Sequence, residues 1–350
     1  MPHTNSVRPL YISPVGRGGV DFGIQNITRA VRRYGAPRAE LLRLPEIYNF
    51  LPMLIPRGLP RGWWQGFDLI QGRSRVAFAL RAPGRPLVTT VHHLTTDPDL
   101  QPYSTLAQRV FYRLVEARYD WWSISSADAV VCVSRYTQQQ VARTYGYTNT
   151  TVIYDGIDTD VFVPTPNLQR RDDGLPDRGG RIRLLFVGNR TRRKGFDLLP
   201  RILDLLPEEY VLYYTSGFQG VDEGPPHPRM VPIGAPDRDG LVAAYQSCDI
   251  LLAPSRLEGF GIVQAEALAC GRPVVTTRIS ALPEVVDHEL SGFLCPRDDV
   301  AAYAEAVRRL GEDEVLRRRF GEYGREKVVR SFGFDQLGRG FLELYSRLLR

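Results

Sequence analysis

Short apolar runs alternate with segments of helical periodicity along most of this chain, and that alternation restricts the possible folds more than any other feature. In the first half, strands are predicted at residues 10–12, 68–70, 86–91, 129–133 and 151–154, and helices at 21–34, 106–123 and 137–145. In the second half, strands are predicted at 183–187, 211–214, 250–252 and 274–275, and helices at 196–206, 261–269 and 334–349. Such a succession is typical of parallel sheets covered by helices.

Length and one polar segment indicate how these elements are divided. A chain of 350 residues with 43% hydrophobic content favours two domains. The stretch PTPNLQRRDDGLPDRGGR, residues 164–181, is rich in proline, glycine and paired charges and is the best candidate for a linker. We therefore expect an α/β chain of two Rossmann-like domains, 1–163 and 182–333, followed by a final helix at 334–350. A cleft between the domains is the expected ligand site, because open α/β sheets bind ligands at the carboxyl ends of their strands.

The charge balance is mildly basic. Lysine and arginine number 45 against 39 aspartates and glutamates, a net charge of +6. Such an excess attracts anions, which include nucleotide phosphates, nucleic acids and acidic membrane surfaces. A nucleic-acid partner is not expected, because the arginines are dispersed and do not alternate with aromatic residues along one recognisable module.

The cysteines and the chain start bear on compartment and metal content. Cys132, Cys248, Cys270 and Cys295 are far apart, with no C-x-x-C and no metal-type spacing. We expect buried thiols in a reducing compartment and no metal site. The start, MPHTNSVRPLYIS, lacks the apolar region of a signal peptide, and no apolar run reaches the ~18 residues that span a bilayer. The expected location is cytoplasmic or peripheral at the inner face of a membrane.

Two glutamates in the stretch SRLEGFGIVQAEALACGRPVV, residues 255–275, need an explanation. Glu258 precedes Gly259, and helical periodicity begins at Gly261, so Glu258 lies at the mouth of a helix whose first N–H groups have no partners. Glu266 lies about two turns further on and needs hydrogen-bond donors if it is buried, which a ligand's hydroxyl groups can supply. The alternative is a solvated loop carboxylate followed by an exposed helix residue.

Residues 248–275 resemble the signature of the retaining glycosyltransferases of family 4, which have the GT-B fold and an E-x7-E block. Further segments resemble the same family: VRPLYISPVGRGGV (7–20), VTTVHHL (88–94), VIYDGIDTDVF (152–162), LLFVGNRTRRKGFDLL (184–199), LPEVVDHELSGFL (282–294) and SFGFDQLGRGFLELYSRLL (331–349). The last segment is similar to the helix that in this fold crosses back to the first domain. The resemblance covers essentially the whole chain.

This resemblance implies transfer of a sugar from a nucleoside-diphosphate-sugar to a hydroxyl acceptor with retained anomeric configuration, and without a required metal or other cofactor. UDP- and GDP-sugars both remain open as donors, and lipid-linked or cell-surface glycan precursors are candidate acceptors. Two alternatives stay open as well. The same fold serves sugar-nucleotide epimerases, and some chains with it bind nucleotide sugars without catalysis.

The resemblance also assigns catalytic roles. Negative charge builds on the departing diphosphate as the glycosidic bond breaks, so fixed cations there lower the barrier. Lys194 is the expected clamp, with Arg190 as its first partner, and Arg192 and Arg193 crowd the same turn. Glu258 would contact the donor sugar or stabilise its positive charge, and His92, at the end of a strand, would reach the sugar or phosphate.

Donor and acceptor contacts complete the set of expected site residues. Glu266 would hold the ribose hydroxyls, and Asn189 stands where the family usually has arginine. The remaining donor-side residues are Gly18, Gly19, Arg193, Gly259, Phe260, Gly261, Ile262 and Ile233. On the acceptor side we expect Gly72, Arg73 and Asp155, the last of which stands where asparagine is usual.

One segment of the first half is unusual. IYNFLPMLIPRGLPRGWW, residues 47–64, mixes apolar and aromatic residues with Arg57 and Arg61. It resembles an interfacial segment suited to lipid headgroups, although a core-packed helix and loop explains it equally well. Together with the tryptophans at 121–122, it raises the hypothesis of contact with a membrane surface.

Overall fold

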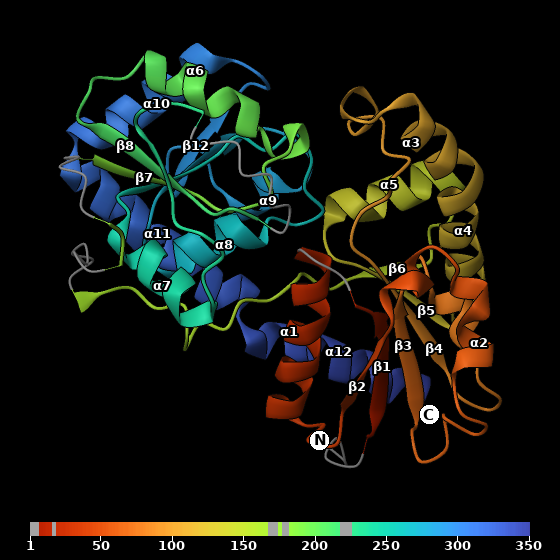
Figure 1. Cartoon of the computed structure of the whole chain (residues 1–350). Coiled ribbons are helices and arrows are strands. Elements are labelled where there is room, and N and C mark those ends of the chain that lie inside the picture. The colour runs from red at the N-terminus through yellow and green to blue at the C-terminus, as the bar shows by residue number, and fades with distance from the viewer. Residues whose placement is uncertain (1–6, 16–18, 167–173, 177–181, 218–225) are drawn as a thin grey trace. The chain divides into compact units, whose positions relative to one another are not determined.

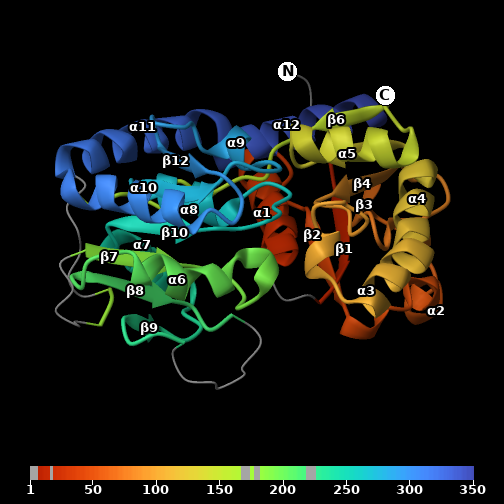
Figure 2. The ribbon, with the colours of Figure 1, turned by 90° about the horizontal axis from the view of Figure 1, so that it is seen from above.

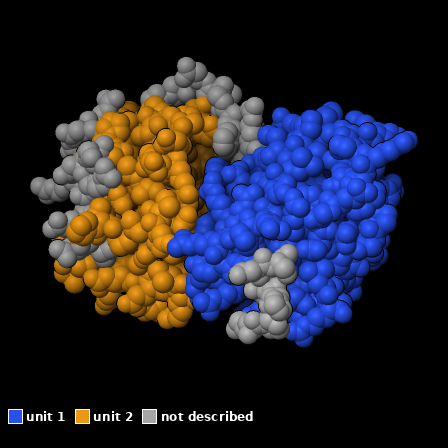
Figure 3. Space-filling view, turned by 90° about the horizontal axis from the view of Figure 1, so that it is seen from below, with its two compact units in different colours: residues 1–156, 334–350 blue, residues 157–333 orange. Residues whose placement is uncertain are grey.

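A computed structural model describes residues 7–15, 19–166, 174–176, 182–217 and 226–350. The chain forms two compact units, unit 1 (residues 1–156 and 334–350) and unit 2 (residues 157–333), which are coloured separately in Figure 3. Most of the predicted linker, at 167–173 and 177–181, lies outside the described residues. Between these two stretches Leu175 is buried, and the Pro176 carbonyl accepts a hydrogen bond from the Tyr213 hydroxyl at 2.7 Å.

Unit 1 is built on a parallel sheet in the order β2-β1-β3-β4-β5-β6 (Figure 1). Its strands are β1 (Pro9–Pro14), β2 (Glu40–Leu44), β3 (Leu69–Arg73), β4 (Leu87–Val91), β5 (Ala129–Cys132) and β6 (Thr150–Val152). The four central strands are almost fully buried, as expected where helices cover both faces of a parallel sheet. Alternate side chains divide the core, since Tyr11 packs with α1 and α12 while Leu10 and Ile12 face the opposite layer.

Helices cover both faces of this sheet. They are α1 (Gly19–Tyr34), α2 (Ile55–Gly58), α3 (Leu106–Phe111), α4 (Ala117–Ser126), α5 (Arg135–Tyr145) and α12 (Phe334–Leu348). Short 3-10 helices occur at η2 (Glu46–Asn49), η3 (Pro52–Leu54), η4 (Ala77–Leu80) and η5 (Gln101–Tyr103), and a π-helical turn, η6 (Tyr112–Glu116), joins α3 to α4.

The final helix, α12, belongs to unit 1, as the fold resemblance implied. It packs along α1, and Gly338 allows the close approach, because a Cβ there would lie 2.9 Å from the carbonyl oxygen of Ala30. The hydroxyl groups of Tyr11 and Tyr345 lie 2.6 Å apart, and the Tyr345 hydroxyl donates to Gln71 Oε1 at 2.5 Å. A buried polar chain therefore fastens the helix to β1 and β3.

Unit 2 contains a second parallel sheet, in the order β12-β11-β10-β7-β8-β9. Its strands are β7 (Ile182–Phe186), β8 (Tyr210–Tyr214), β9 (Met230–Pro232), β10 (Ile250–Ala253), β11 (Val274–Thr277) and β12 (Gly292–Cys295). Numbered from its own first strand, this sheet has the order 3-2-1-4-5-6 of the Rossmann fold, whereas unit 1 begins with the 2-1-3-4-5 order typical of flavodoxin-like folds. The prediction of two parallel α/β sheets is confirmed.

The helices of unit 2 form two layers around its sheet. They are α6 (Leu199–Asp204), α7 (Arg238–Ser247), α8 (Ile262–Ala269), α9 (Leu282–Val285), α10 (Val300–Glu312) and α11 (Glu314–Phe332), with short 3-10 helices η8 (Arg192–Lys194) and η9 (Phe196–Leu198). Figures 1 and 2 show α6 and α10 together over one face, where they share a large core cluster with β7, β8 and β10.

The structure describes all four cysteines, which the sequence analysis expected to be buried thiols. Cys132, Cys248, Cys270 and Cys295 are all buried, and none of them forms a disulfide. Across the described ranges, none of the helices combines the length and apolar character that crossing a membrane requires.

Candidate active site

The turn after β7 places basic residues at the carboxyl edge of the second sheet. Thr191 caps the start of η8, and its hydroxyl accepts a hydrogen bond from the Lys194 backbone N–H at 3.4 Å. Gly195 ends η8 with φ of +72°, and a Cβ there would lie 2.1 Å from the carbonyl oxygen of Pro254. Glycine is therefore needed where this turn meets the loop that follows β10.

The loop after β10 carries Glu258 to the same edge. The Glu258 backbone N–H donates to Ser280 Oγ at 3.0 Å, which fixes this part of the loop. Gly261 has φ of +115° and precedes α8 without a side-chain cap. The first N–H groups of α8 thus have no intrahelical partner, and the positive end of the helix dipole lies a few residues from Glu258.

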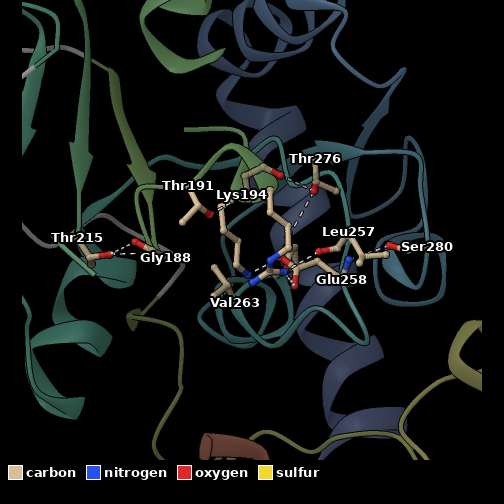
Figure 4. Close-up of polar contacts among 12 residues, drawn as sticks. Gly188, Thr191, Lys194, Thr215, Leu257, Glu258, Val263, Thr276 and Ser280 are labelled. Carbon is tan, nitrogen blue, oxygen red and sulfur yellow. Dashed lines mark hydrogen bonds and ion pairs between the residues drawn. The ribbon is translucent and has the colours of Figure 1, made fainter. Parts of the chain in front are cut away.

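The turn and the loop meet in an ion pair, shown in Figure 4. Lys194 Nζ lies 2.6 Å from Glu258 Oε1, and Arg193 Nη1 lies 3.8 Å from Glu258 Oε2. Both members of the close pair are largely buried, with side-chain exposures of 16% and 12%. Burial alone would raise the pKa of Glu258, but the attraction of Lys194 and Arg193 holds that pKa below its usual value. The result is a positively charged cluster that already contains its own carboxylate.

This cluster lies at the point where the strand order of the sheet reverses. β7 and β10 are adjacent and parallel, with Ile250 paired to Leu184, yet the chain leaves them toward opposite edges of the sheet. Ligands of open α/β sheets bind outside the carboxyl ends of strands at such a switch point. Lys194 follows the first of these strands and Glu258 follows the second, so the topology predicts a ligand beside both.

Arg256, which the sequence did not single out, holds the two loops together. Its guanidinium donates to both carboxylate oxygens of Asp197, at 2.6 and 3.0 Å, and to Asp298 Oδ1 at 2.6 Å. It also donates to the carbonyl of Arg192, and its own backbone N–H donates to the carbonyl of Arg193 at 2.8 Å. Such two-pronged contacts fix geometry as well as charge, so Arg256 is a positioning residue for the pair.

Glu266 lies on α8, about two turns beyond Glu258 along the chain. Its carboxylate Oε2 accepts a hydrogen bond from the Tyr245 hydroxyl at 2.9 Å. Burial raises the pKa of Glu266 to about 7, against the opposing effects of that hydrogen bond and of the Arg238 charge. Glu266 is therefore neither an ordinary exposed helix residue nor one that depends on a ligand for its first hydrogen bond.

The other donor-side residues in the turn after β7 differ in exposure and in their neighbours. Of the three arginines in the turn, Arg193 is the one placed beside Glu258, and it also donates to the Leu257 carbonyl at 3.0 Å. Arg192 is exposed, and Arg190 is half-buried. Asn189 lies against Gly217, where a Cβ would come within 2.7 Å of the Asn189 side-chain oxygen.

Of four further donor-side residues, Ile233 and Phe260 serve the fold. The Ile233 N–H donates to the Tyr214 carbonyl at 2.9 Å and so extends the pairing of β8 with β9. The Phe260 ring is buried and packs edge-on against Phe332, with ring centres 5.2 Å apart. Gly259 lies in the loop between Glu258 and α8, and Ile262 is the first residue of that helix.

In unit 1, His92 and Asp155 lie around a glycine of α1. A Cβ at Gly23 would lie 3.0 Å from His92 Nε2 and 3.3 Å from Asp155 Oδ1. His92 and Asp155 are buried, and neither ring nitrogen of His92 makes a hydrogen bond within the part of the chain that the structure describes. Burial, with help from the Arg73 charge, lowers the pKa of His92 to about 3, and burial raises the pKa of Asp155 to about 7. We call this group of three residues the polar recess.

The remaining unit 1 residues differ in their surroundings. Gly18 lies outside the described residues, and Gly19 begins α1. Gly72 is enclosed in β3, where a Cβ would lie 2.7 Å from Leu80 Cδ1, so its lack of a side chain serves packing. Arg73 follows it and donates to Asn49 Oδ1, and burial together with the Arg75 charge lowers its pKa to about 10.

Metal-binding groups are scarce near these sites. Within the described ranges, histidine, cysteine, aspartate and glutamate nowhere gather in groups of three that suit a metal ion.

Comparisons with known proteins place this geometry in context. Residues 8–161 match the family described as "Glycosyltransferase Family 4", and residues 231–327 match "Glycosyl transferases group 1". The chain is 30% identical over 242 residues to the D-inositol 3-phosphate glycosyltransferase of Xylanimonas cellulosilytica. That match covers 64% of this chain and 58% of the relative, so the chain matches only about three-fifths of the relative's length.

Solved structures resemble the chain over nearly its full length. Sucrose-phosphate synthase from Thermosynechococcus elongatus is similar with a TM-score of 0.80 and 21% identity, covering 98% of this chain and 99% of that one. HepE of Anabaena in complex with UDP-glucose is similar with a TM-score of 0.75 and 18% identity, covering 97% and 99%. These similarities confirm the predicted GT-B fold.

Proposed function

This chain belongs to glycosyltransferase family 4, and on that premise we propose that it transfers a sugar from a nucleoside diphosphate to a hydroxyl acceptor with retained anomeric configuration. One observation carries the proposal. Lys194, Arg193 and Glu258 form a preassembled cluster at the switch point of a Rossmann-ordered sheet, next to the uncapped start of α8.

The cluster suits a departing diphosphate. A lysine ammonium has three donors, and Glu258 accepts one of them, so two remain for phosphate oxygens. The N–H groups at the start of α8 add partial positive charge for the same anion. Since the charge on the diphosphate grows as the glycosidic bond breaks, these donors stabilise the transition state more than the bound substrate. Glu258 is then positioned to offset positive charge on the sugar.

We assign Glu266 to the ribose hydroxyl groups of the nucleoside. A carboxylate accepts hydrogen bonds from two vicinal hydroxyl groups, which is the pattern that a ribose presents. Tyr245 holds Glu266 in place from α7. UDP-glucose is the first donor to test, because the HepE structure of Anabaena contains it, and the GDP-sugars follow.

The polar recess of unit 1 is assigned to a substrate hydroxyl. Buried polar groups without partners are rare in native proteins, and a neutral imidazole next to a carboxyl group offers both donors and acceptors. Arg73 is assigned to the acceptor. A phosphorylated cyclitol is the first acceptor to test, given the name of the Xylanimonas relative, and lipid-linked and cell-surface glycan precursors come next.

The cations of the cluster can neutralise the diphosphate, so a divalent metal ion is not needed for that purpose. We expect transfer to continue in excess EDTA, because Lys194 and Arg193 supply the positive charge that a metal ion would otherwise provide. A strict Mg²⁺ or Mn²⁺ requirement would contradict this assignment.

Thermal shift with UDP, GDP and their sugars tests donor binding first, because a ligand that binds only the folded state raises apparent stability. Transfer from the stabilising donor is then measured as release of the nucleoside diphosphate that depends on acceptor. An isomerised sugar nucleotide formed without acceptor would instead identify an epimerase. Binding without any turnover across the acceptor panel would favour the non-catalytic alternative.

A further inference from the structure

The helix that runs from Leu106 to Ser126 exposes large hydrophobic residues to solvent. It consists of α3, the π-helical turn η6 and α4 in unbroken succession, a length of about 31 Å at 1.5 Å per residue. Five large apolar side chains on it are 40–76% exposed: Leu106, Val110, Leu114, Trp121 and Trp122. We call their common surface the α3–α4 face. In Figures 1 and 2 the helix runs along one side of unit 1.

The π-helical turn brings the two ends of this face into line. In an uninterrupted α-helix, Trp122 would lie about 160° around the axis from Leu106, at 100° per residue. The turn at Tyr112–Glu116 contributes one extra residue to the helix, which reduces that offset by about 100°. The tryptophans therefore join the stripe that Leu106 and Val110 begin, and π-helical turns of this kind are frequently functional.

The exposed charges on the helix all have one sign. Arg109, Arg113 and Arg118 are exposed, whereas both acidic residues of the helix point inward. Glu116 is buried and pairs with Arg75 at 2.6 Å, and Asp120 is buried as well. The α3–α4 face is thus apolar and cationic, with no exposed carboxylate along the helix.

A neighbouring segment also exposes large hydrophobic residues. Exposed large hydrophobic residues occur between η2 and α2, at Ile47, Phe50, Leu51, Met53 and Leu54. Both this segment and α4 pack against η4, and the Phe78 ring of η4 contacts Trp122 with ring centres 5.4 Å apart. Trp63 and Trp64, which the sequence also offered as interfacial residues, instead pack against a buried core cluster.

We propose that the α3–α4 face docks on an anionic lipid bilayer and holds unit 1 at the membrane surface. An interfacial helix combines exposed apolar and tryptophan side chains with arginines that reach lipid phosphates, which is the composition found here. A second copy of the chain is a poorer fit. A two-fold interface through this face would bring the three arginines of each copy close to those of the other, and like charges repel.

The first measurement is co-flotation of the full chain with vesicles of phosphatidylcholine, with and without phosphatidylglycerol. We expect binding to the anionic vesicles that weakens as salt rises, since salt screens exposed charges. R113E/R118E should bind at least about tenfold more weakly, given the contribution of each arginine near a charged surface. R318E/R319E is the matched control, because it makes the same charge change on the exposed face of α11 in unit 2.

The apolar part is tested with a second pair of variants. V110S/L114S should weaken vesicle binding at every salt concentration, whereas V315S/V329S, which removes exposed valines from α11, should not. Brominated lipids should quench tryptophan fluorescence in W63F/W64F and much less in W121F/W122F. Unchanged circular dichroism and melting temperature establish that each variant is folded.

Two results would overturn the proposal. Wild-type protein that fails to bind anionic vesicles at low salt excludes a lipid surface. If the wild-type protein is a dimer that does not bind vesicles, and V110S/L114S is a monomer, the face is an interface with a second copy of the chain. Membrane docking does not depend on the proposed transfer reaction, so variants that lose docking should still bind the donor. Thermal shift of the same variants with nucleoside diphosphates therefore tests the two proposals separately.

Discussion

Lys194 and Glu258 in unit 2 meet as an ion pair at 2.6 Å, whereas His92 and Asp155 in unit 1 are more deeply buried, and the His92 imidazole makes no hydrogen bond within the described residues. The first group is an internal ion pair, and the contacts of Arg256 with Asp197 and Asp298 hold the loops that carry it. The second lies close to Gly23, where a Cβ would come within 3.0 Å of His92 Nε2 and 3.3 Å of Asp155 Oδ1.

This difference indicates how each group meets a ligand. A satisfied pair is preorganised, so it presents fixed charge to a substrate without first rearranging. An unsatisfied buried group carries a desolvation penalty that a ligand's hydrogen bonds can relieve. Unit 2 should therefore contribute mainly to the rate of transfer, and the polar recess mainly to binding.

The largest expected effect follows removal of the pair. K194A/E258A should retain the fold and lower transfer by about a thousandfold or more, because it removes the cation assigned to the diphosphate and the carboxylate assigned to the sugar. The measurement is acceptor-dependent release of the nucleoside diphosphate at saturating donor. Transfer at the wild-type rate would contradict both roles.

The same variants test whether the pair is internally neutralised. K194A alone leaves Glu258 buried with Arg193 at 3.8 Å, and should lower the free energy of unfolding by about 3 kcal/mol. The double variant should lose less than the sum of the two single variants, since neither charge is then left alone. Urea denaturation of the four proteins measures this coupling, and additive losses would mean that the pair does not act as a unit.

The next effect comes from filling the polar recess. G23A places a methyl group 3.0 Å from His92 Nε2 and should weaken substrate binding roughly tenfold or more, as one extra carbon in a tight pocket does. Stability should change by less than about 1 kcal/mol, because alanine favours a helix while the contact opposes it. G340A is the control, since its methyl group would meet Ile153 instead. Equal KM values in the two variants would exclude a ligand in the recess.

Central strands and the loops between strands and helices were predictable, whereas three of the four edge strands and the long-range contacts were not. The buried run Ile250–Ala253 in β10 is apolar throughout, so it stood out in the sequence. The strands that the sequence analysis missed, β2, β9 and β12, all lie at sheet edges. In β2, whose sequence is ELLRL, all but the last residue are partly exposed, and β9 has only three residues, so neither forms a clear apolar run.

The candidate site shows the same division. Lys194 and Glu258 follow strands directly, so the topology of a parallel sheet brings them to one edge. Arg256 depends on Asp197, 59 positions away, and Tyr245 reaches Glu266 across 21 positions. Arg256 had one local signal. It is the charged residue between Ser255 and Glu258, in a loop that the sequence analysis had already identified as part of the site. Gly23 had no such signal, because its role depends on the close approach of His92 and Asp155, which are distant in the sequence.

The titration of Asp155 and His92 should have an effect of intermediate size, seen in the pH dependence of stability. The folded-state pKa of Asp155 is raised to about 7, so its contribution to stability is complete below about pH 4 and is lost as pH rises toward 7. The folded-state pKa of His92 is lowered to about 3, so its contribution is complete above about pH 6.5 and is lost as pH falls toward 3. The two contributions oppose each other between about pH 4 and 6.5.

Single substitutions should separate these contributions. Relative to wild type, D155N should gain stability as pH rises from about 4 to 7, and H92N should gain as pH falls from about 6.5 to 3, each by at most about 1.4 kcal/mol per pH unit. Urea denaturation across this range measures both differences, with E343Q on the exposed side of α12 as the control. Parallel pH profiles for wild type and D155N would show that Asp155 has a partner.

The smallest effect should follow loss of the Tyr245 hydroxyl. Its hydrogen bond lowers the pKa of Glu266 against the effect of burial, so Y245F should raise that pKa above its present value of about 7 and leave more of the carboxyl protonated near neutral pH. A protonated carboxyl accepts fewer hydrogen bonds from ribose, so donor affinity should fall a few-fold at pH 7, because one neutral hydrogen bond contributes about 1 kcal/mol. The deficit should shrink as pH rises and Glu266 ionises in both proteins, which isothermal titration with UDP can follow. A deficit of constant size at every pH would mean that Tyr245 only positions α8, and that the ionisation of Glu266 does not govern nucleotide binding.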